Sequence, residues 1–86
     1  MIEITDRAVE LLTKALSAAR RFDPNATIRI VGEPGAVRFE LADEPGPDDR
    51  ELGCGADTIH VERHLAGVVD VEDPHDRLVL RDTAST

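Results

Sequence analysis

Aromatic side chains are almost missing from this chain of 86 residues, which has two phenylalanines, Phe22 and Phe39, and no tryptophan or tyrosine. The apolar core must therefore come from valine, isoleucine, leucine and alanine. A chain this short is one domain and hides only about 60% of the surface that its unfolded state exposes. Such a core can support one helix packed on a small sheet, but hardly a roomy apolar cavity.

Basic residues are also few. Ten lysines and arginines face 18 aspartates and glutamates, which gives a formal net charge of −8. This balance repels phosphate backbones and anionic lipids, so we expect neither nucleic acid nor membrane as a partner. The N-terminal stretch MIEITDRAVELL carries acids where a signal peptide needs basic residues, and no segment approaches the length of a membrane span. We expect a cytoplasmic protein.

Cys54 is the sole cysteine, which excludes an intrachain disulfide. It lies in Gly53-Cys54-Gly55, where the sequence predicts an exposed, flexible loop. The neighbouring Glu51 and Asp57 would raise the pKa of a thiol, whereas a reactive cysteine needs an electropositive setting. We therefore expect Cys54 to have no catalytic role and to be dispensable for folding.

Other chemical motifs are weak. His60-x-x-x-His64 has the spacing of two metal ligands on a helix, but it lacks the zincin glutamate and straddles the end of a predicted strand; His75 stands apart. The acidic stretch 43–51 lacks the spacing of a calcium loop, so we expect it to be solvated. No phosphate loop or Ser-His-Asp arrangement is present. We expect no catalytic, cofactor-binding or metal-ligating residues, and no enzyme.

The hydrophobic pattern predicts one helix followed by strands. Apolar residues recur at helical spacing over Thr5–Arg21, with Thr5 as N-cap and basic residues in the last turn. Beyond the helix the period becomes two. The predicted strands are 1–4, 27–30, 37–41, 58–62, 68–73 and 77–82, with a surface loop over 42–57, one helical turn over 63–67, and a turn at 74–76.

The two strands after the helix are predicted to form a hairpin. Ile28 and Ile30 should face the core together with Val37, Phe39 and Leu41. A one-residue slip would turn a whole face outward, so the register is well specified. The most compact register pairs Ile30 with Phe39 and Ile28 with Leu41. It also places Arg29 opposite Glu40 on the outer face, with the turn spanning 32–36.

The order of these elements resembles the HesB/IscA-like family of A-type iron–sulfur cluster assembly proteins. The matching stretches are IEITDRAVELLTKAL, TIRI, VRFELADEPGPDDRE and GADTIHVERHLAGVVDVEDPHDRLVLRD, of which FELADEPGPDD is the most specific. The resemblance implies an α+β fold in which one N-terminal amphipathic helix packs on a small, mostly antiparallel or mixed β-sheet. It covers a single HesB-like domain over residues 1–82, followed by a frayed tail over 83–86.

The same resemblance implies where metal ligands would lie. The family holds iron or a cluster with three cysteines, one in a loop between the second and third strands and two near the C-terminus. Here the loop reads VGEPGA, with Glu33 and Pro34 where the ligand should be, and LRDTAST contains no cysteine. Cys54 matches none of the family's ligands. We therefore expect a degenerate metal site and no cofactor.

Two functional hypotheses follow. The preferred one is a non-enzymatic protein related to iron–sulfur cluster biogenesis that binds no cluster and acts as an interaction or accessory module. Its expected partners are proteins, either iron–sulfur assembly components or a second copy of the chain. The alternative is a genuine iron or iron–sulfur carrier with an atypical site at a dimer interface, built from Cys54, carboxylates or histidines. The two differ in the number of thiolates that they require.

Overall fold

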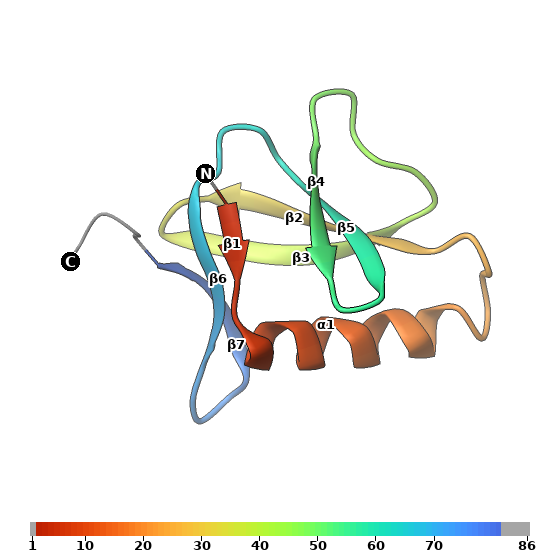
Figure 1. Cartoon of the computed structure of the whole chain (residues 1–86), viewed down its shortest axis with the longest axis horizontal. Coiled ribbons are helices and arrows are strands. Elements are labelled where there is room, and N and C mark those ends of the chain that lie inside the picture. Colours follow the sequence, from red (N-terminus) through yellow and green to blue (C-terminus); the bar gives the residue numbers. More distant parts are fainter. Residues whose placement is uncertain (1, 82–86) are drawn as a thin grey trace.

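The computed structural model describes residues 2–81, which contain one helix and seven strands (Figure 1). The small α+β fold with one N-terminal helix on mixed and antiparallel sheets is confirmed. The predicted tail over 83–86 lies outside the described residues. The elements are β1 (Ile2–Ile4), α1 (Asp6–Ala19), β2 (Thr27–Glu33), β3 (Ala36–Ala42), β4 (Arg50–Cys54), β5 (Asp57–Val61), β6 (Gly67–Glu72) and β7 (Arg77–Arg81).

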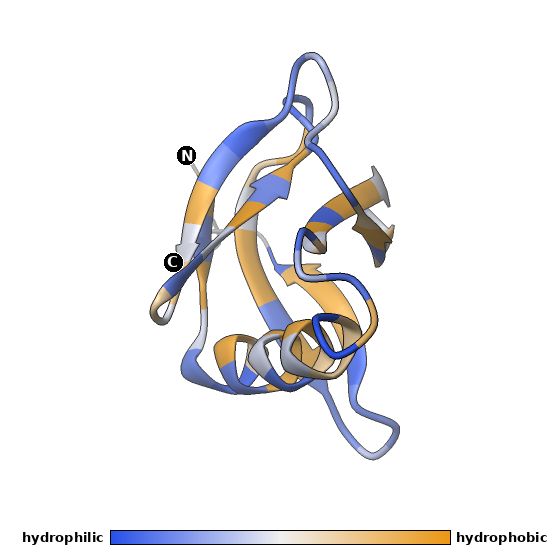
Figure 2. Ribbon diagram, turned by 90° about the vertical axis from the view of Figure 1, so that its right-hand side faces the viewer, coloured by the Kyte–Doolittle hydropathy of each residue, from blue (hydrophilic) through white to orange (hydrophobic). Residues whose placement is uncertain are grey.

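The strands form two sheets. One has the order β1-β6-β7, with β1 parallel and β7 antiparallel to β6. The other has the order β3-β2-β5-β4, in which β2 and β5 are parallel and the two outer pairs are antiparallel. Helix α1 runs along one side of both sheets (Figure 1). Hydrophobic residues recur along the strands and the helix (Figure 2), and their buried side chains form one core.

Helix α1 starts where the sequence predicts. The side chain of Thr5 accepts a hydrogen bond from the amide of Ala8, as an N-cap does. Leu12 and Leu16 lie on the buried face, on the predicted stripe. The predicted end is wrong: the helix stops at Ala19, so its last turn holds no basic residue, and Arg20 and Arg21 follow it.

The hairpin register is confirmed. Ile30 pairs with Phe39, Ile28 with Leu41, and Arg29 with Glu40. The predicted five-residue turn is too long, because the pairing continues to Glu33 and Ala36 and leaves Pro34 and Gly35 as the connection. Leu41 was also expected inside, but it is exposed. Strand β3 is at the edge of its sheet, and α1 ends at Ala19. The helix therefore does not cover the end of β3 that carries Leu41.

The core lies between the helix and the two sheets and contains no aromatic ring among its buried members. Ile59 and Val61 point into it from β5, while His60 between them is only half buried. Phe39 packs against its edge. The buried members are Ala8, Leu12, Leu16, Ala26, Ile28, Ile30, Cys54, Ile59, Val61, Leu65, Val69, Val71 and Leu78.

Two further predictions, a loop and a helical turn, are corrected by the structure. The stretch 42–57 was expected to be a surface loop throughout, yet Arg50–Cys54 forms β4 and pairs with β5. The glycines and charged residues of this stretch have low strand propensity, so the sequence did not predict β4. The strand is stabilised by its pairing with β5. The stretch 63–67 was expected to be a helical turn. It contains a turn closed by a hydrogen bond from the amide of Leu65 to the carbonyl of Glu62, and Gly67 already belongs to β6.

Within residues 2–81, the structure has no helix with the length and apolar character needed to cross a membrane.

Candidate functional site

The β2–β3 turn is the part of the molecule where the family resemblance places a ligand. Gly32 precedes it with a φ of 116°, in a region that side chains rarely adopt. A Cβ atom on Gly32 would clash with the carbonyl oxygen of Ala36. At Gly35, by contrast, a Cβ would meet nothing within 4 Å. The shape of the turn therefore depends on Gly32 and much less on Gly35.

Two side chains from the segment after β5 hold Gly32 in place. The amide of Gly32 donates to Oε1 of Glu62 at 2.8 Å, and its carbonyl oxygen lies 2.7 Å from Nε2 of His64. A carbonyl only accepts hydrogen bonds, so Nε2 of His64 must carry the proton. Both polar backbone groups of Gly32 are thus satisfied by Glu62 and His64. The contacts with Glu62 and His64 hold the backbone next to the β2–β3 turn in place.

The same turn forms one wall of a hollow of about 480 Å³ against β7. Its polar groups come mainly from Glu72, Arg77 and Arg81, and the guanidinium of Arg81 already donates to Asp70 at 2.7 Å. No thiol or imidazole lines the hollow within the described chain. The lining residues are Pro34, Gly35, Ala36, Val37, Glu72, Arg77, Leu78, Val79, Leu80 and Arg81.

Cys54 is not exposed, and that expectation is wrong. Its relative exposure is 1%, because it ends β4 and packs against α1, where its Sγ lies 3.9 Å from the carbonyl oxygen of Val9. Burial raises the pKa of the thiol. The sequence suggested a surface loop because Cys54 lies between two glycines. Gly53 and Gly55 are indeed exposed, but Cys54 is not. Cys54 therefore lies against α1, whereas the β2–β3 turn lies against β7.

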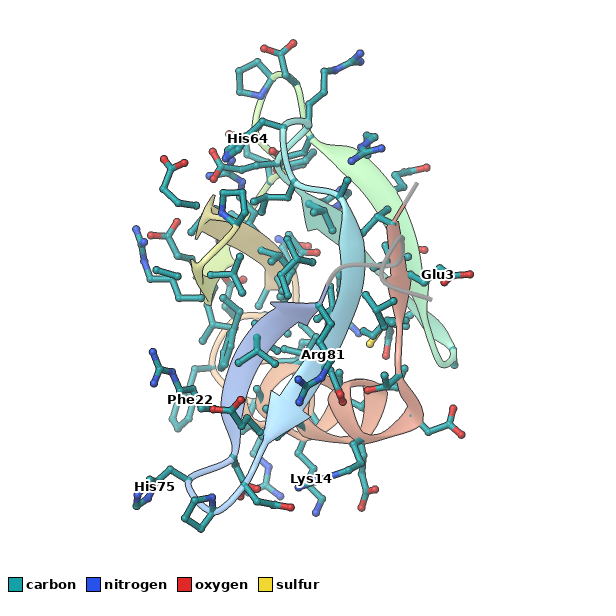
Figure 3. The ribbon with its side chains drawn as sticks, turned by 90° about the vertical axis from the view of Figure 1, so that its left-hand side faces the viewer. Glu3, Lys14, Phe22, His64, His75 and Arg81 are labelled. Atoms are coloured by element: carbon teal, nitrogen blue, oxygen red, sulfur yellow. The ribbon has the colours of Figure 1, made fainter. Side chains whose placement is uncertain are left out.

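The three histidines do not converge. His64 lies near the β2–β3 turn and His75 in the β6–β7 turn, at opposite ends of the molecule (Figure 3). His60 lies on β5, paired with Arg29 and Glu51. Across residues 2–81, no group of three histidine, cysteine or acidic side chains is placed so that it could hold a metal ion.

The acidic stretch 43–51 is tied to the sheet by Arg29. Its guanidinium donates to both carboxylate oxygens of Asp49, at 2.6 and 3.0 Å, and the amide of Gly46 donates to Asp49 at 2.7 Å. The side chain of Asp49 is only 3% exposed, so the expectation of a fully solvated loop is wrong at this residue. The hydrogen bonds from Arg29 lower the pKa of Asp49 below its ordinary value. A hollow of about 400 Å³ lies beside this pair, next to Glu62 and His64.

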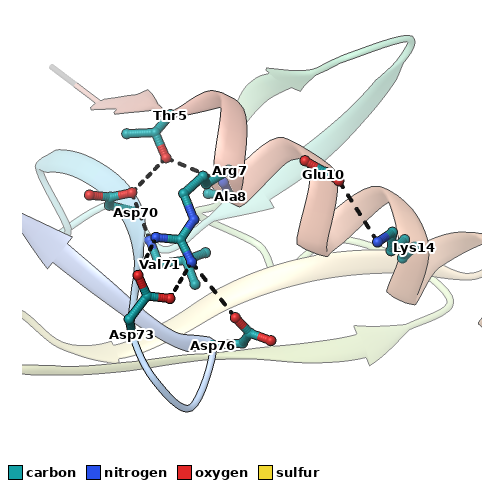
Figure 4. A network of polar contacts seen from close by, with 9 residues as sticks. All are labelled: Thr5, Arg7, Ala8, Glu10, Lys14, Asp70, Val71, Asp73 and Asp76. Atoms are coloured by element: carbon teal, nitrogen blue, oxygen red, sulfur yellow. Dashed lines mark hydrogen bonds and ion pairs between the residues drawn. The ribbon is translucent and has the colours of Figure 1, made fainter.

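A second polar cluster fastens the start of α1 to β6 (Figure 4). The hydroxyl of Thr5 donates to Asp70 at 2.8 Å while it caps the helix, and Arg81 donates to the other oxygen of Asp70. The hydrogen bonds from Arg81 and Thr5 lower the pKa of Asp70 to about 2. Two residues further on, Arg7 makes a two-point ion pair with Asp73 at 2.6 and 3.0 Å. These contacts serve the fold, because each charged group faces a partner from another element.

Sequence reasoning missed the residues that shape this site. Glu62 and His64 gave no signal, because their partner is a backbone group that lies 30 residues or more away in the chain. Asp70 could have been noticed, since it is an acid between two buried valines of a strand. The site offers a hydrogen-bonded turn, paired charges and backbone groups, and within residues 2–81 it brings together no set of soft metal ligands.

The fold defines a small α+β domain, and its β2–β3 turn, Pro34-Gly35, carries no thiol. No family model matches the chain. It is 33% identical over 76 residues to an uncharacterized protein, blr1755, of Bradyrhizobium diazoefficiens; the match covers 78% of this chain and 70% of the relative. The chain belongs to the same family as that protein.

Proposed function

We propose that this protein is a HesB/IscA-like interaction or accessory module related to iron–sulfur cluster biogenesis, and that it binds no cluster itself. The observation that carries the proposal is the β2–β3 turn. In the family that the sequence resembles, the corresponding loop supplies a cysteine. Here the connection is Pro34-Gly35, preceded by Glu33, and its backbone is held by Glu62 and His64.

The donor set does not fit an iron–sulfur cluster. Such clusters are held chiefly by thiolates, about four for each cluster. These 86 residues contain one cysteine, and Cys54 is buried against α1 with a raised pKa. A thiolate is the form that binds metal, so both the position and the protonation of Cys54 oppose this role.

The polar groups also argue for a role without catalysis. A general base or nucleophile needs a free, accessible atom beside a reacting group. The thiol of Cys54 is covered, and Nε2 of His64 donates to the carbonyl of Gly32. What the molecule presents instead is a surface whose polar groups are largely paired within the fold, which suits the docking of another protein.

Reconstitution tests the absence of a cluster. The purified chain would be incubated anaerobically with iron and sulfide, desalted, and examined by visible absorption and iron analysis. We expect no stable chromophore and far less than one iron per chain. Near-stoichiometric iron with a chromophore that disappears in Cys54→Ser would overturn the proposal in favour of a carrier with an atypical site.

A genetic measurement tests the link to cluster biogenesis. Deleting the gene in its own organism should lower the specific activity of a [4Fe–4S] enzyme while leaving a cluster-free enzyme unchanged. Both the wild-type gene and Cys54→Ala should restore that activity, because the thiol is not a ligand. Unchanged activity of the cluster enzyme after deletion would contradict the proposed pathway.

A further inference from the structure

An apolar patch lies beyond the C-terminal end of α1. Phe22 is 91% exposed and Leu41 is 53% exposed, and they are the large hydrophobic side chains that the described residues leave in solvent. Phe22 comes from the turn after α1 and lies at the periphery of the molecule (Figure 3), whereas Leu41 lies near the end of β3. The two side chains line one hollow of about 270 Å³, which we call the Phe22 hollow; its residues are Ala19, Phe22, Asp23, Ala26, Leu41, Ala42 and Asp43.

The backbone that presents Phe22 is held in place. The amides of Phe22 and Asp23 both donate to the carbonyl of Ala19, at 3.1 and 3.0 Å. The guanidinium of Arg20 donates to the carbonyl of Ala26 at 3.2 Å and to Asp57 at 2.8 Å. The ring is therefore presented from a turn that is bonded on both sides.

Leaving this ring in water forgoes a large stabilisation. Full burial of a phenylalanine side chain is worth about 1.5–3 kcal/mol. In a chain whose core lacks aromatic rings among its buried members, Phe22 would be a valuable core residue, yet the fold places it outside. Exposed aromatic residues beside a hollow are typical of binding surfaces, where they act as anchors.

The rim of the Phe22 hollow is acidic. Asp23 and Asp43 line it, and a hydrogen bond between their side chains lowers the pKa of Asp23 and raises that of Asp43. No lysine or arginine lines the hollow. The guanidinium of Arg20, two residues before Phe22, faces Asp57, and Arg21 directly precedes Phe22 in the chain. The whole chain has a formal net charge of −8, so its field adds to the local one.

We infer that the Phe22 hollow docks a basic segment of a partner protein, which inserts one large apolar side chain beside Phe22 and directs lysine or arginine toward Asp23 and Asp43. This inference rests on the proposed function for its interaction role and adds the surface and the chemistry of the partner. The hollow is slightly smaller than the 300–1,000 Å³ typical of small-molecule pockets, which suits a side chain rather than a free ligand.

Charge argues against a second copy as the occupant. A two-fold contact through the Phe22 hollow would bring Asp23 and Asp43 of both copies together. Like charges that face one another at an interface are unfavourable, and each chain carries −8. A basic partner instead meets complementary charge and gains faster association.

The test is an NMR titration of the ¹⁵N-labelled chain with a synthetic ten-residue peptide that alternates lysine and leucine. Two further peptides serve as probes, one with glutamate for lysine and one with alanine for leucine. We expect the lysine–leucine peptide to shift the amide signals of residues 19–26 and 41–43, and the other two to bind at least tenfold more weakly. Shifts centred on another face, or equal binding of the glutamate peptide, would overturn the inference.

Matched variants distinguish binding at the Phe22 hollow from a general effect of the net negative charge. Phe22→Ser should weaken binding at least tenfold, and Asp23→Asn with Asp43→Asn several-fold, with less salt dependence. The control, Asp48→Asn with Glu51→Gln, removes the same charge from exposed residues elsewhere and should change binding less than twofold. Equal loss in the control would overturn the inference. So would a concentration-dependent dimer that Phe22→Ser abolishes, because a second copy would then be the occupant.

These results and those on cluster biogenesis are independent. Peptide binding that persists in a chain that also takes up iron would overturn only the proposed function. Absence of peptide binding in a chain that takes up no iron would overturn only the docking surface.

Discussion

Arg29 and Asp49 form a two-point ion pair in which the side chain of Asp49 is only 3% exposed, and this pair joins the acidic loop to the middle of the four-stranded sheet. Hydrogen bonds that involve a charged group contribute about 1.5–3 kcal/mol. We expect Asp49→Asn to lower the free energy of unfolding by about 1–3 kcal/mol, because the guanidinium loses its charged partner. Urea denaturation followed by circular dichroism measures this change.

The control for this pair is Asp48→Asn, an exposed neighbour in the same loop. Its effect should stay within about 0.5 kcal/mol, as is usual for surface substitutions. The pKa of Asp49 is lowered by folding, so its contribution is complete above the unfolded value, about 3.9, and is lost as pH falls through the lower folded value. The difference between wild type and Asp49→Asn should therefore shrink in acid, and a constant difference would contradict the assignment.

Burial of Cys54 predicts that its replacement is felt by the core. Cys54→Ser places a shorter hydroxyl side chain in a buried site that holds the carbonyl of Val9, 3.9 Å from the sulfur, and the side chain of Thr13, which hydrogen-bonds the thiol. A buried hydroxyl that is poorly paired costs about 1–3 kcal/mol, so we expect a drop in melting temperature. Cys54→Ala should cost less, since it adds no polar group. The thiol of the folded protein should also react slowly with a thiol reagent, and rapid labelling under native conditions would show that it is accessible.

Gly32 and Gly35 provide a matched pair in one turn. Gly32→Ala forces a side chain into a backbone of φ 116° and against the carbonyl of Ala36. Strain of this kind costs about 1–3 kcal/mol, and it should also loosen the contacts of Glu62 and His64. Gly35→Ala meets open space and should have a small effect. Thermal unfolding of both variants decides the point, and equal losses would show that the turn does not depend on the geometry at Gly32.

The pair of Thr5 and Asp70 predicts a dependence of stability on acid. Folding lowers the pKa of Asp70 to about 2, so its stabilisation is complete above about 3.9 and disappears as pH falls toward 2. Asp70→Asn should lower stability at pH 7 and flatten this part of the acid unfolding curve. Thr5→Ala should cost about 1 kcal/mol through the lost cap, whereas Thr5→Ser keeps the hydroxyl and should stay near wild type. An unchanged acid curve in Asp70→Asn would exclude this aspartate as its source.

Local patterns predicted what depends on neighbours in sequence. Thr5 as N-cap follows from the chemistry of a hydroxyl before an amphipathic helix, and the pairing of Ile30 with Phe39 follows from the two-residue period. Both signals are set within a few residues or across one turn, so they can be read from the printed chain.

Features that depend on distant residues were missed. The strand that ends at Cys54 is supported by β5 and by α1, and its own glycines and charges favoured a loop. Leu41 was placed inside by its alternation with Glu40, but burial also requires an element above the strand, and α1 has already ended. The contacts of Glu62 and His64 with Gly32 join segments that no periodicity connects.

The parallel pairing of β1 with β6 has a consequence for how the chain folds during synthesis. Thr5 and Asp70 are 65 residues apart, and β1 has its hydrogen-bonded partner in Gly67–Val69. When the ribosome has released only the first half of the chain, β1 has no neighbouring strand and the apolar face of α1 lacks part of its cover. Closing so long a loop is slow, and exposed apolar surface in such intermediates promotes aggregation. The N-terminal segment must therefore wait for the C-terminal hairpin, and a chaperone that shields α1 in that interval would raise the yield of folded protein.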